Sequence, residues 1–168
     1  MTQIAYHPAF DPYSSLLRII RVFMATSSQM DSIKARIGEF FILFPERLIE
    51  ARLSPQLRAR AKRITVGPRY PYDRLPSSRI LFDRMQPSFE AALQTMQVRG
   101  FVTSAPDGTM SLNQEVLPVE ITSLALEQNG NEAYLADTLG DVLSAYPTGG
   151  PDGLKARSKL MEFRYDVA

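Results

Sequence analysis

Few residues of this sequence could carry out chemistry. The single histidine, His7, precedes a proline, and metal sites ordinarily need several converging ligands, so a structural or surface role is the simpler interpretation. Asp137 and Asp141 lie four residues apart and could share a cation on one helix face, although an exposed acidic face explains them as well. Glycine-rich phosphate-binding motifs and the nucleophile-elbow motif are missing. The sequence therefore disfavours an enzyme, and we predict no catalytic residue, metal or cofactor.

Basic side chains are the most concentrated chemical feature of the sequence. Residues 51–72 contain six lysines and arginines and no aspartate or glutamate. Such side chains supply the salt-dependent attraction that dominates affinity for phosphate groups, so this segment could hold nucleic acid without reading its sequence. A face that meets only water, or a contact with an acidic protein, would explain it as well. The candidate DNA-contacting residues are Arg58, Arg60, Lys62, Arg63 and Arg69.

The formal net charge of +1 hides an uneven distribution of charge along the chain. Residues 1–99 contain 15 basic and 8 acidic side chains, whereas residues 100–154 contain 8 acidic side chains and no basic one. A basic front and an acidic rear suggest partners of opposite charge.

Aromatic residues near prolines are candidate contacts with another protein. Phe10 and Tyr13 could either cover the first helix as a hydrophobic staple or contact a partner. Tyr70 and Tyr72 lie beside an arginine and two prolines, and tyrosine and arginine are favoured at interface hot spots. The full set of candidate partner-contacting residues is Phe10, Asp11, Tyr13, Arg18, Tyr70 and Tyr72.

The first helix has a clear start signal. Asp11-Pro12 predicts a helix from Pro12 to about Thr26, because the Asp11 carboxylate can accept hydrogen bonds from N–H groups of the first turn and proline fits the first helical position. The apolar residues of this segment recur at helical spacing. Arg18 and Arg21 share the opposite side, which we expect to meet water or a partner.

Three further helical segments precede a long irregular one. Asp31 is a plausible cap for the second helix, whose apolar end FFILF at 40–44 must be buried. Pro45 can open a third short helix, and Ser54-Pro55 repeats the cap-then-proline signal for a fourth, which carries the basic cluster. Residues 66–76 contain three prolines and a glycine and are predicted to form an ordered loop or linker.

A helix, a glycine and a β-hairpin follow in the order of the C-terminal half of a winged helix. A helical pattern begins at Ser77, is expected to break and restart at Pro87, and ends at Gly100. Residues 101–104 and 109–112 flank a tight turn and predict two short strands. The helices upstream supply the other members of this fold.

The surface that would read DNA in a winged helix has few basic residues in this sequence. The helix over 87–99 carries Arg99 against Glu90, and the tip of the wing carries Asp107 with no basic residue. A protein that reads the major groove ordinarily places arginine or lysine there. Contact with another protein is therefore favoured over sequence-specific readout, and the runner-up is a free-standing winged-helix DNA-binding transcription regulator.

The predicted fold class is mainly α (α+β), with a small β-hairpin as the wing. We expect a winged-helix domain over 1–116 with an inserted basic segment at 45–76. Two more helices, separated by Asn129-Gly130-Asn131, predict a C-terminal helical hairpin over 117–147 that packs on this domain. Residues 148–168 are expected to form a flexible joint and tail, with a short helix near its end.

Length and composition agree with a single globular domain. The chain has 168 residues, 45% of them hydrophobic and 22% charged. The absence of cysteine excludes disulfides, thiolate metal sites and a cysteine nucleophile. The sequence shows neither a signal peptide nor a long apolar run, so we expect a cytoplasmic protein that makes no membrane contact.

Short motifs of this sequence resemble one protein family. They are HPAFDPY at 7–13 with the helix that follows, FFILFP at 40–45, and VRGFV at 98–102. In these the chain is similar to the middle components of bacterial ABC three-component systems. Those are small winged-helix proteins encoded between a coiled-coil, SMC-like ABC ATPase and an effector, in Lamassu-like systems directed against phages and plasmids.

The resemblance implies an adaptor without catalytic residues. Such a subunit would dock on the SMC-like ATPase and couple the sensing of DNA to an effector subunit, for instance a nuclease. It implies that the Phe-Asp-Pro-Tyr motif at 10–13 defines the fold first and contacts a partner second. The basic segment at 51–72 would lie along DNA without sequence preference, and the acidic helices would face a basic surface of a partner.

Overall fold

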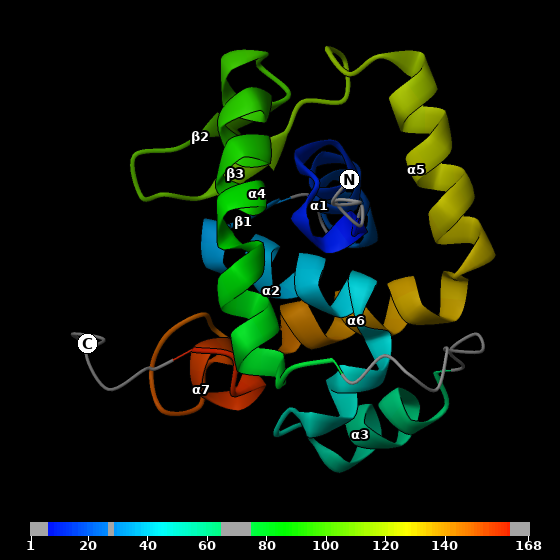
Figure 1. Cartoon of the computed structure of the whole chain (residues 1–168), viewed down its shortest axis with the longest axis vertical. Coiled ribbons are helices and arrows are strands. Elements are labelled where there is room, and N and C mark those ends of the chain that lie inside the picture. The colour runs from blue at the N-terminus through cyan, green and yellow to red at the C-terminus, as the bar shows by residue number, and fades with distance from the viewer. Residues whose placement is uncertain (1–6, 27–28, 65–74, 162–168) are drawn as a thin grey trace, which may run out of the picture.

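Helix α1 (Pro12–Ala25) lies at the centre of the structure, and most other elements pack around it (Figure 1). The computed structural model describes residues 7–26, 29–64 and 75–161. Asp11 caps α1 as predicted, because its side chain accepts a hydrogen bond from the Ser14 N–H at 2.9 Å. The short 3-10 helix η1 (Pro8–Phe10) precedes this cap.

Helix α2 (Ser32–Leu43) packs against α1, and its apolar end is buried as predicted. Asp31 caps it by accepting from two backbone N–H groups. The 3-10 helix η2 (Pro45–Glu50) and helix α3 (Pro55–Lys62) follow, each with proline in its first turn. Capping side chains therefore located α2 and α3, and the proline in its first turn located η2.

Helix α4 (Ser78–Val98) is continuous, so the predicted interruption at Pro87 is wrong. Pro87 removes one helical hydrogen bond. It lies on the exposed side of α4, where water can satisfy the carbonyl left without a partner. Gly100 ends the helix as predicted, in the left-handed conformation with φ of 72°.

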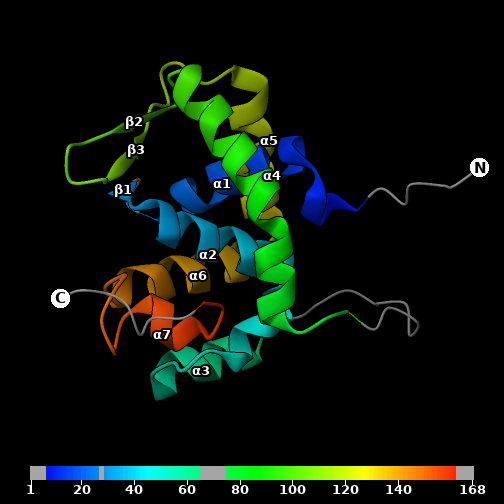
Figure 2. The same cartoon turned by 60° about the vertical axis from the view of Figure 1, so that its left-hand side comes forward.

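A three-stranded antiparallel sheet lies beside these helices (Figure 2). Strands β2 (Val102–Ser104) and β3 (Met110–Leu112) form the predicted hairpin. Strand β1 (Gln29–Met30), which the sequence did not reveal, pairs with the far side of β3, so the order is β1-β3-β2. The protein is thus mainly helical with one small sheet, as expected.

Helices α5 (Val119–Asn131) and α6 (Ala133–Ala145) differ from the predicted side-by-side hairpin. They are separated by Glu132 alone and meet at a corner (Figure 1). Helix α5 packs along α1, and α6 packs beneath α1 and α2. The 129–131 segment lies inside α5, because each of these residues continues the helical hydrogen-bond pattern.

The segment after α6 packs on the body of the protein as far as Met161, unlike the flexible joint and tail predicted for 148–168. Helix α7 (Leu154–Ser158) lies between α6 and α3 (Figure 2). Its Leu154 and the following Leu160 are buried in the core. Backbone N–H of Arg52 donates to the carbonyl of Arg157 at 2.8 Å, which joins this segment to the start of α3.

Candidate interaction surfaces

The basic cluster lies on the outer side of α3, at one end of the molecule (Figure 1). The Ser54 side chain caps the helix by accepting from a backbone N–H, and Ala61 faces the core. Arg58, Lys62 and Arg63 are exposed and make no ion pair with any other described residue. These three side chains therefore lie at the surface of the described part of the protein.

Arg60 belongs to a different contact. Its guanidinium donates to the Asp141 carboxylate of α6, and this hydrogen bond raises the pKa of Arg60. The Tyr134 hydroxyl donates to the Arg60 carbonyl at 3.3 Å. Arg60 thus joins α3 to α6, and Asp141 is paired with an arginine. Arg69, the remaining candidate for DNA contact, lies outside the described residues.

The basic front and the acidic rear of the sequence contact each other at two more places. Arg21 of α1 forms an ion pair with Glu132 at the α5–α6 corner. Arg52 and Arg157 both donate to Asp152, at 3.3 and 3.2 Å. Part of the charge asymmetry is therefore neutralised within the chain.

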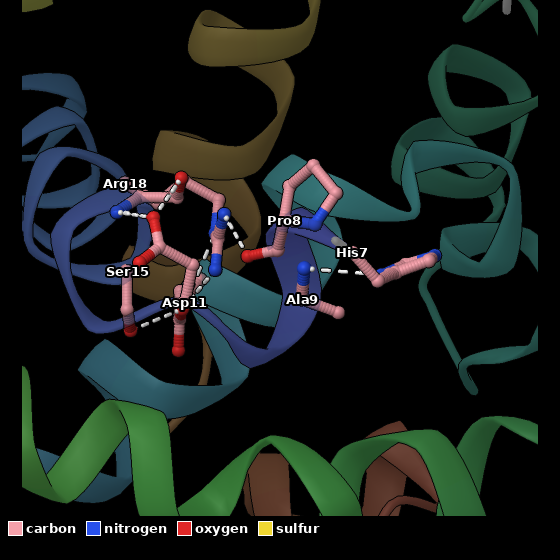
Figure 3. A network of polar contacts seen from close by, with 8 residues as sticks. His7, Pro8, Ala9, Asp11, Ser15 and Arg18 are labelled. Carbon is pink, nitrogen blue, oxygen red and sulfur yellow. Dashed lines mark hydrogen bonds and ion pairs between the residues drawn. The ribbon is translucent and has the colours of Figure 1, made fainter. Parts of the chain in front are cut away.

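The residues before α1 form a compact turn (Figure 3). The His7 ring nitrogen Nδ1 accepts a hydrogen bond from the Ala9 N–H at 3.1 Å, so this histidine caps η1. The Asp11 carboxylate accepts from both the backbone N–H and the hydroxyl of Ser14, at 2.9 and 2.7 Å. Both side chains therefore have structural partners within this turn.

Two aromatic residues, Phe10 of this turn and Tyr13 at the start of α1, remain accessible to a partner. The Phe10 side chain stacks in a tilted arrangement near the His7 ring, with ring centroids 5.3 Å apart, and is 44% exposed. Tyr13 is 85% exposed. Tyr70 and Tyr72, the other aromatic candidates, lie outside the described residues.

Arg18 is buried, contrary to the expectation that its side of α1 meets water or a partner. Its guanidinium donates to Glu39 Oε1 of α2 at 2.8 Å and to the Pro8 carbonyl at 3.1 Å (Figure 3). Ser15 also donates to Glu39 Oε1, at 2.5 Å. Burial raises the pKa of Glu39, and the charge of Arg18 and the Ser15 hydrogen bond oppose this shift. The network joins three segments of the chain.

Arg21 is buried as well, at the junction of α1 with α5 and α6. Besides its ion pair with Glu132, it donates from Nε to Asn129 Oδ1 at 2.9 Å. The Asn129 amide donates back to the Arg21 carbonyl at 3.0 Å. This contact could not be predicted from the sequence, because its members lie more than 100 residues apart.

A groove of about 350 Å³ runs between these two arginines. Leu17, Ile42 and Leu43 form its apolar side, and Gln128 and Glu132 form part of its polar side. It lies next to the turn that carries Phe10 and Tyr13. The groove and these two aromatic side chains together form a surface where another protein could bind.

Two kinds of feature are absent from the described part of the chain. Across residues 7–26, 29–64 and 75–161, no three His, Cys, Asp or Glu side chains are grouped so that they could hold a metal ion. In the same ranges, no helix combines the length and the apolar character needed to cross a membrane.

Comparison with known proteins adds one match. The family model described as ABC-three component (ABC-3C) system Middle Component 5 matches residues 4–166, nearly the whole chain. No curated protein and no solved structure matches significantly.

Proposed function

The chain belongs to the Middle Component 5 family of ABC-three component systems, and we propose that it is the non-catalytic adaptor of a defence complex. As a middle component of a multi-subunit system it has partner subunits. In this proposal it connects an SMC-like ABC ATPase to an effector, and couples the sensing of DNA to the action of that effector.

The order of the elements supports a winged-helix architecture for the adaptor. Along the chain α1, β1, α2, α4, β2 and β3 follow one another, and the strands are arranged as β1-β3-β2. A winged helix has this order, with α4 as its third helix and β2–β3 as its wing. Helices η2 and α3 then belong to an insertion between the second and third helices.

The observation that carries the DNA-binding part of the proposal is the exposed positive charge on α3, which pairs with no described acidic residue. Arg58 and Lys62 of α3 and Arg63 at its C-cap are exposed, and no described acidic residue forms an ion pair with them. Phosphate groups attract such side chains without regard to base sequence. The exposed side of α4, in contrast, carries both acidic and basic residues. We therefore assign nonspecific DNA contact to α3.

Charge reversal tests this assignment. We expect Arg58→Glu/Lys62→Glu to weaken DNA binding by the assembled complex and to reduce the slope of log affinity against log salt by about two units, one for each lost phosphate contact. The matched control is Arg84→Glu/Arg99→Glu on α4, which changes the charge equally and should leave the slope unchanged. An unchanged slope in the α3 variant would place the DNA elsewhere.

Co-purification tests the adaptor role itself. The tagged chain, expressed together with the ATPase and the effector of its own system, should elute with both in fixed stoichiometry. A chain that elutes alone would contradict the proposal. If it also protected one operator sequence as a homodimer, and Arg99→Glu abolished that protection, it would be a free-standing transcription regulator.

A further inference from the structure

Among the residues that the structure describes, the contacts of helix α5 lie along one of its sides. Of its 13 residues, Ala125 alone is fully buried. Three large apolar side chains face outward: Val119 is 75%, Leu124 43% and Leu126 58% exposed. Exposed apolar residues on one short helix are typical of a surface that another protein covers.

The exposed side of α5 contains a row with the spacing of a helix–helix seam. Val119, Ser123, Leu126 and Gly130 follow one another at intervals of four, three and four residues, so they lie on one side of the helix. All four are apolar or small, and all four are exposed. A partner helix could therefore approach α5 closely along this row.

Gly130 supports close approach independently of the apolar residues. It lies inside α5, and its φ is not in the left-handed range. A Cβ atom added to it would meet no described atom within 4 Å, so neither backbone conformation nor packing against the described residues requires glycine here. Glycine weakens a helix compared with alanine. The position is better explained by a neighbour outside the chain.

The charge around this row indicates what kind of partner fits. Glu120 and Glu127 lie next to the row and two helical turns apart, so they share one side of α5. Both are exposed. Residues 100–154 contain no lysine or arginine. This segment therefore supplies no positive side chain that could neutralise the two glutamates. A partner with apolar side chains flanked by lysine or arginine would satisfy both features.

We propose that the outer side of α5 docks a basic amphipathic helix of a partner subunit. The inference rests on the proposed adaptor function and adds to it a surface distinct from the turn that carries Phe10 and Tyr13. The Val119–Gly130 row would receive the apolar side of that helix, and Glu120 and Glu127 would pair with its basic residues.

Binding of the purified ATPase and effector subunits to single variants tests this surface. Leu126→Lys should weaken binding of one of the two subunits by about tenfold or more, because it places a cation in an apolar seam facing a basic helix. Ile80→Lys is the matched control: Ile80 is 46% exposed in the first turn of α4, which lies away from α5 (Figure 1). The control should bind within about twofold of the wild type.

Two further variants separate docking from a purely structural role. Gly130→Ala should keep or raise the melting temperature, because its new methyl group meets open space in the free chain, and should nevertheless weaken binding of the same subunit. Glu120→Lys/Glu127→Lys should weaken that binding as well and reduce its dependence on salt. A Gly130→Ala variant that binds like the wild type would contradict close approach at this position.

The outcomes distinguish this inference from the function on which it rests. If the wild type binds both subunits and the α5 variants bind equally well, the docking surface is wrong and the adaptor role stands. If the wild type binds neither subunit, both proposals fail. If the wild type associates with itself and Leu126→Lys abolishes this association, the occupant is a second copy, which overturns the inference.

Discussion

Two ion pairs of this protein use the same chemistry in different surroundings. Arg18–Glu39 joins α1 to α2 in the core, where the side chains are 7% and 1% exposed. Arg60–Asp141 joins α3 to α6 at the surface, where they are 33% and 60% exposed. A buried pair is costly to break, because the partner left behind is a charge without water. A surface pair is cheap to break, because water replaces either partner.

The largest effect is expected from breaking the buried pair. Arg18→Met leaves the Glu39 carboxylate buried without its cation, so we expect a loss of about 3–5 kcal/mol in the free energy of unfolding, measured by urea denaturation. Arg18→Met/Glu39→Leu removes both charges and should recover most of that loss. A single variant that loses less than about 1 kcal/mol would show that water reaches this site.

The stability of Arg18→Met should also depend on pH, which distinguishes the buried ion pair from the surface pair. Burial raises the pKa of Glu39, so the folded chain binds this proton more readily than the unfolded chain does. The contribution of Glu39 to stability is therefore present below its ordinary pKa and is lost as the pH rises through the raised pKa.

Without Arg18 the pKa should rise further, so the destabilisation in Arg18→Met should shrink as the pH falls from about 8 to about 4. Urea denaturation across this range measures it. The control Arg18→Met/Glu39→Gln has no carboxyl at position 39 and should lack this titration. If the free energy of unfolding changed with pH by the same amount in Arg18→Met and in this control, the result would count against our explanation.

An intermediate effect is expected at Arg21. Its own side chain is buried, but the Glu132 side chain with which it pairs is 49% exposed. Arg21→Met should therefore cost about 1.5–3 kcal/mol, the range for hydrogen bonds to a charged group, because water can solvate Glu132 afterwards. Thermal and urea denaturation measure this cost. A loss as large as that of Arg18→Met would mean that water does not solvate Glu132 and that it behaves as a buried carboxylate like Glu39.

The smallest effect is expected at the surface pair. Asp141→Asn should lower the free energy of unfolding by no more than about 1 kcal/mol, and the difference should fall further in 1 M salt. Because the change leaves Arg60 without an anionic partner, DNA binding through α3 should be kept or strengthened. A weaker affinity for DNA would mean that Asp141 orients α3 for its ligand.

The sequence predicted those parts of the fold that local chemistry determines. The start of α1 at Pro12 and the stop at Gly100 each depend on one side chain or one backbone conformation beside the element itself. Strand β1 was missed, because two residues show no periodicity and their strand partner lies at 110–111. The break at Pro87 was wrong, because the sequence alone does not show which side of α4 faces water.

Which candidate residues are exposed could be predicted in part, for the same reason. Exposure of Arg58, Lys62 and Arg63 follows from the charge of a short helix with few apolar residues. Arg18 and Arg21 could not be placed correctly, because the carboxylates that permit their burial lie 21 and 111 residues further along the chain. An arginine can be buried when a carboxylate of another element pairs with it, and the sequence alone does not show which carboxylate that is.

The backbone bridge between Arg52 and Arg157 also bears on how the protein is made. These residues are 105 positions apart. At about 5–20 residues per second, a ribosome adds the second of them roughly 5–20 s after the first. During that interval the start of α3 has no partner on this side, and the cavity that Leu154 and Leu160 fill stays open. The newly made chain therefore reaches its finished fold only after its last quarter has emerged.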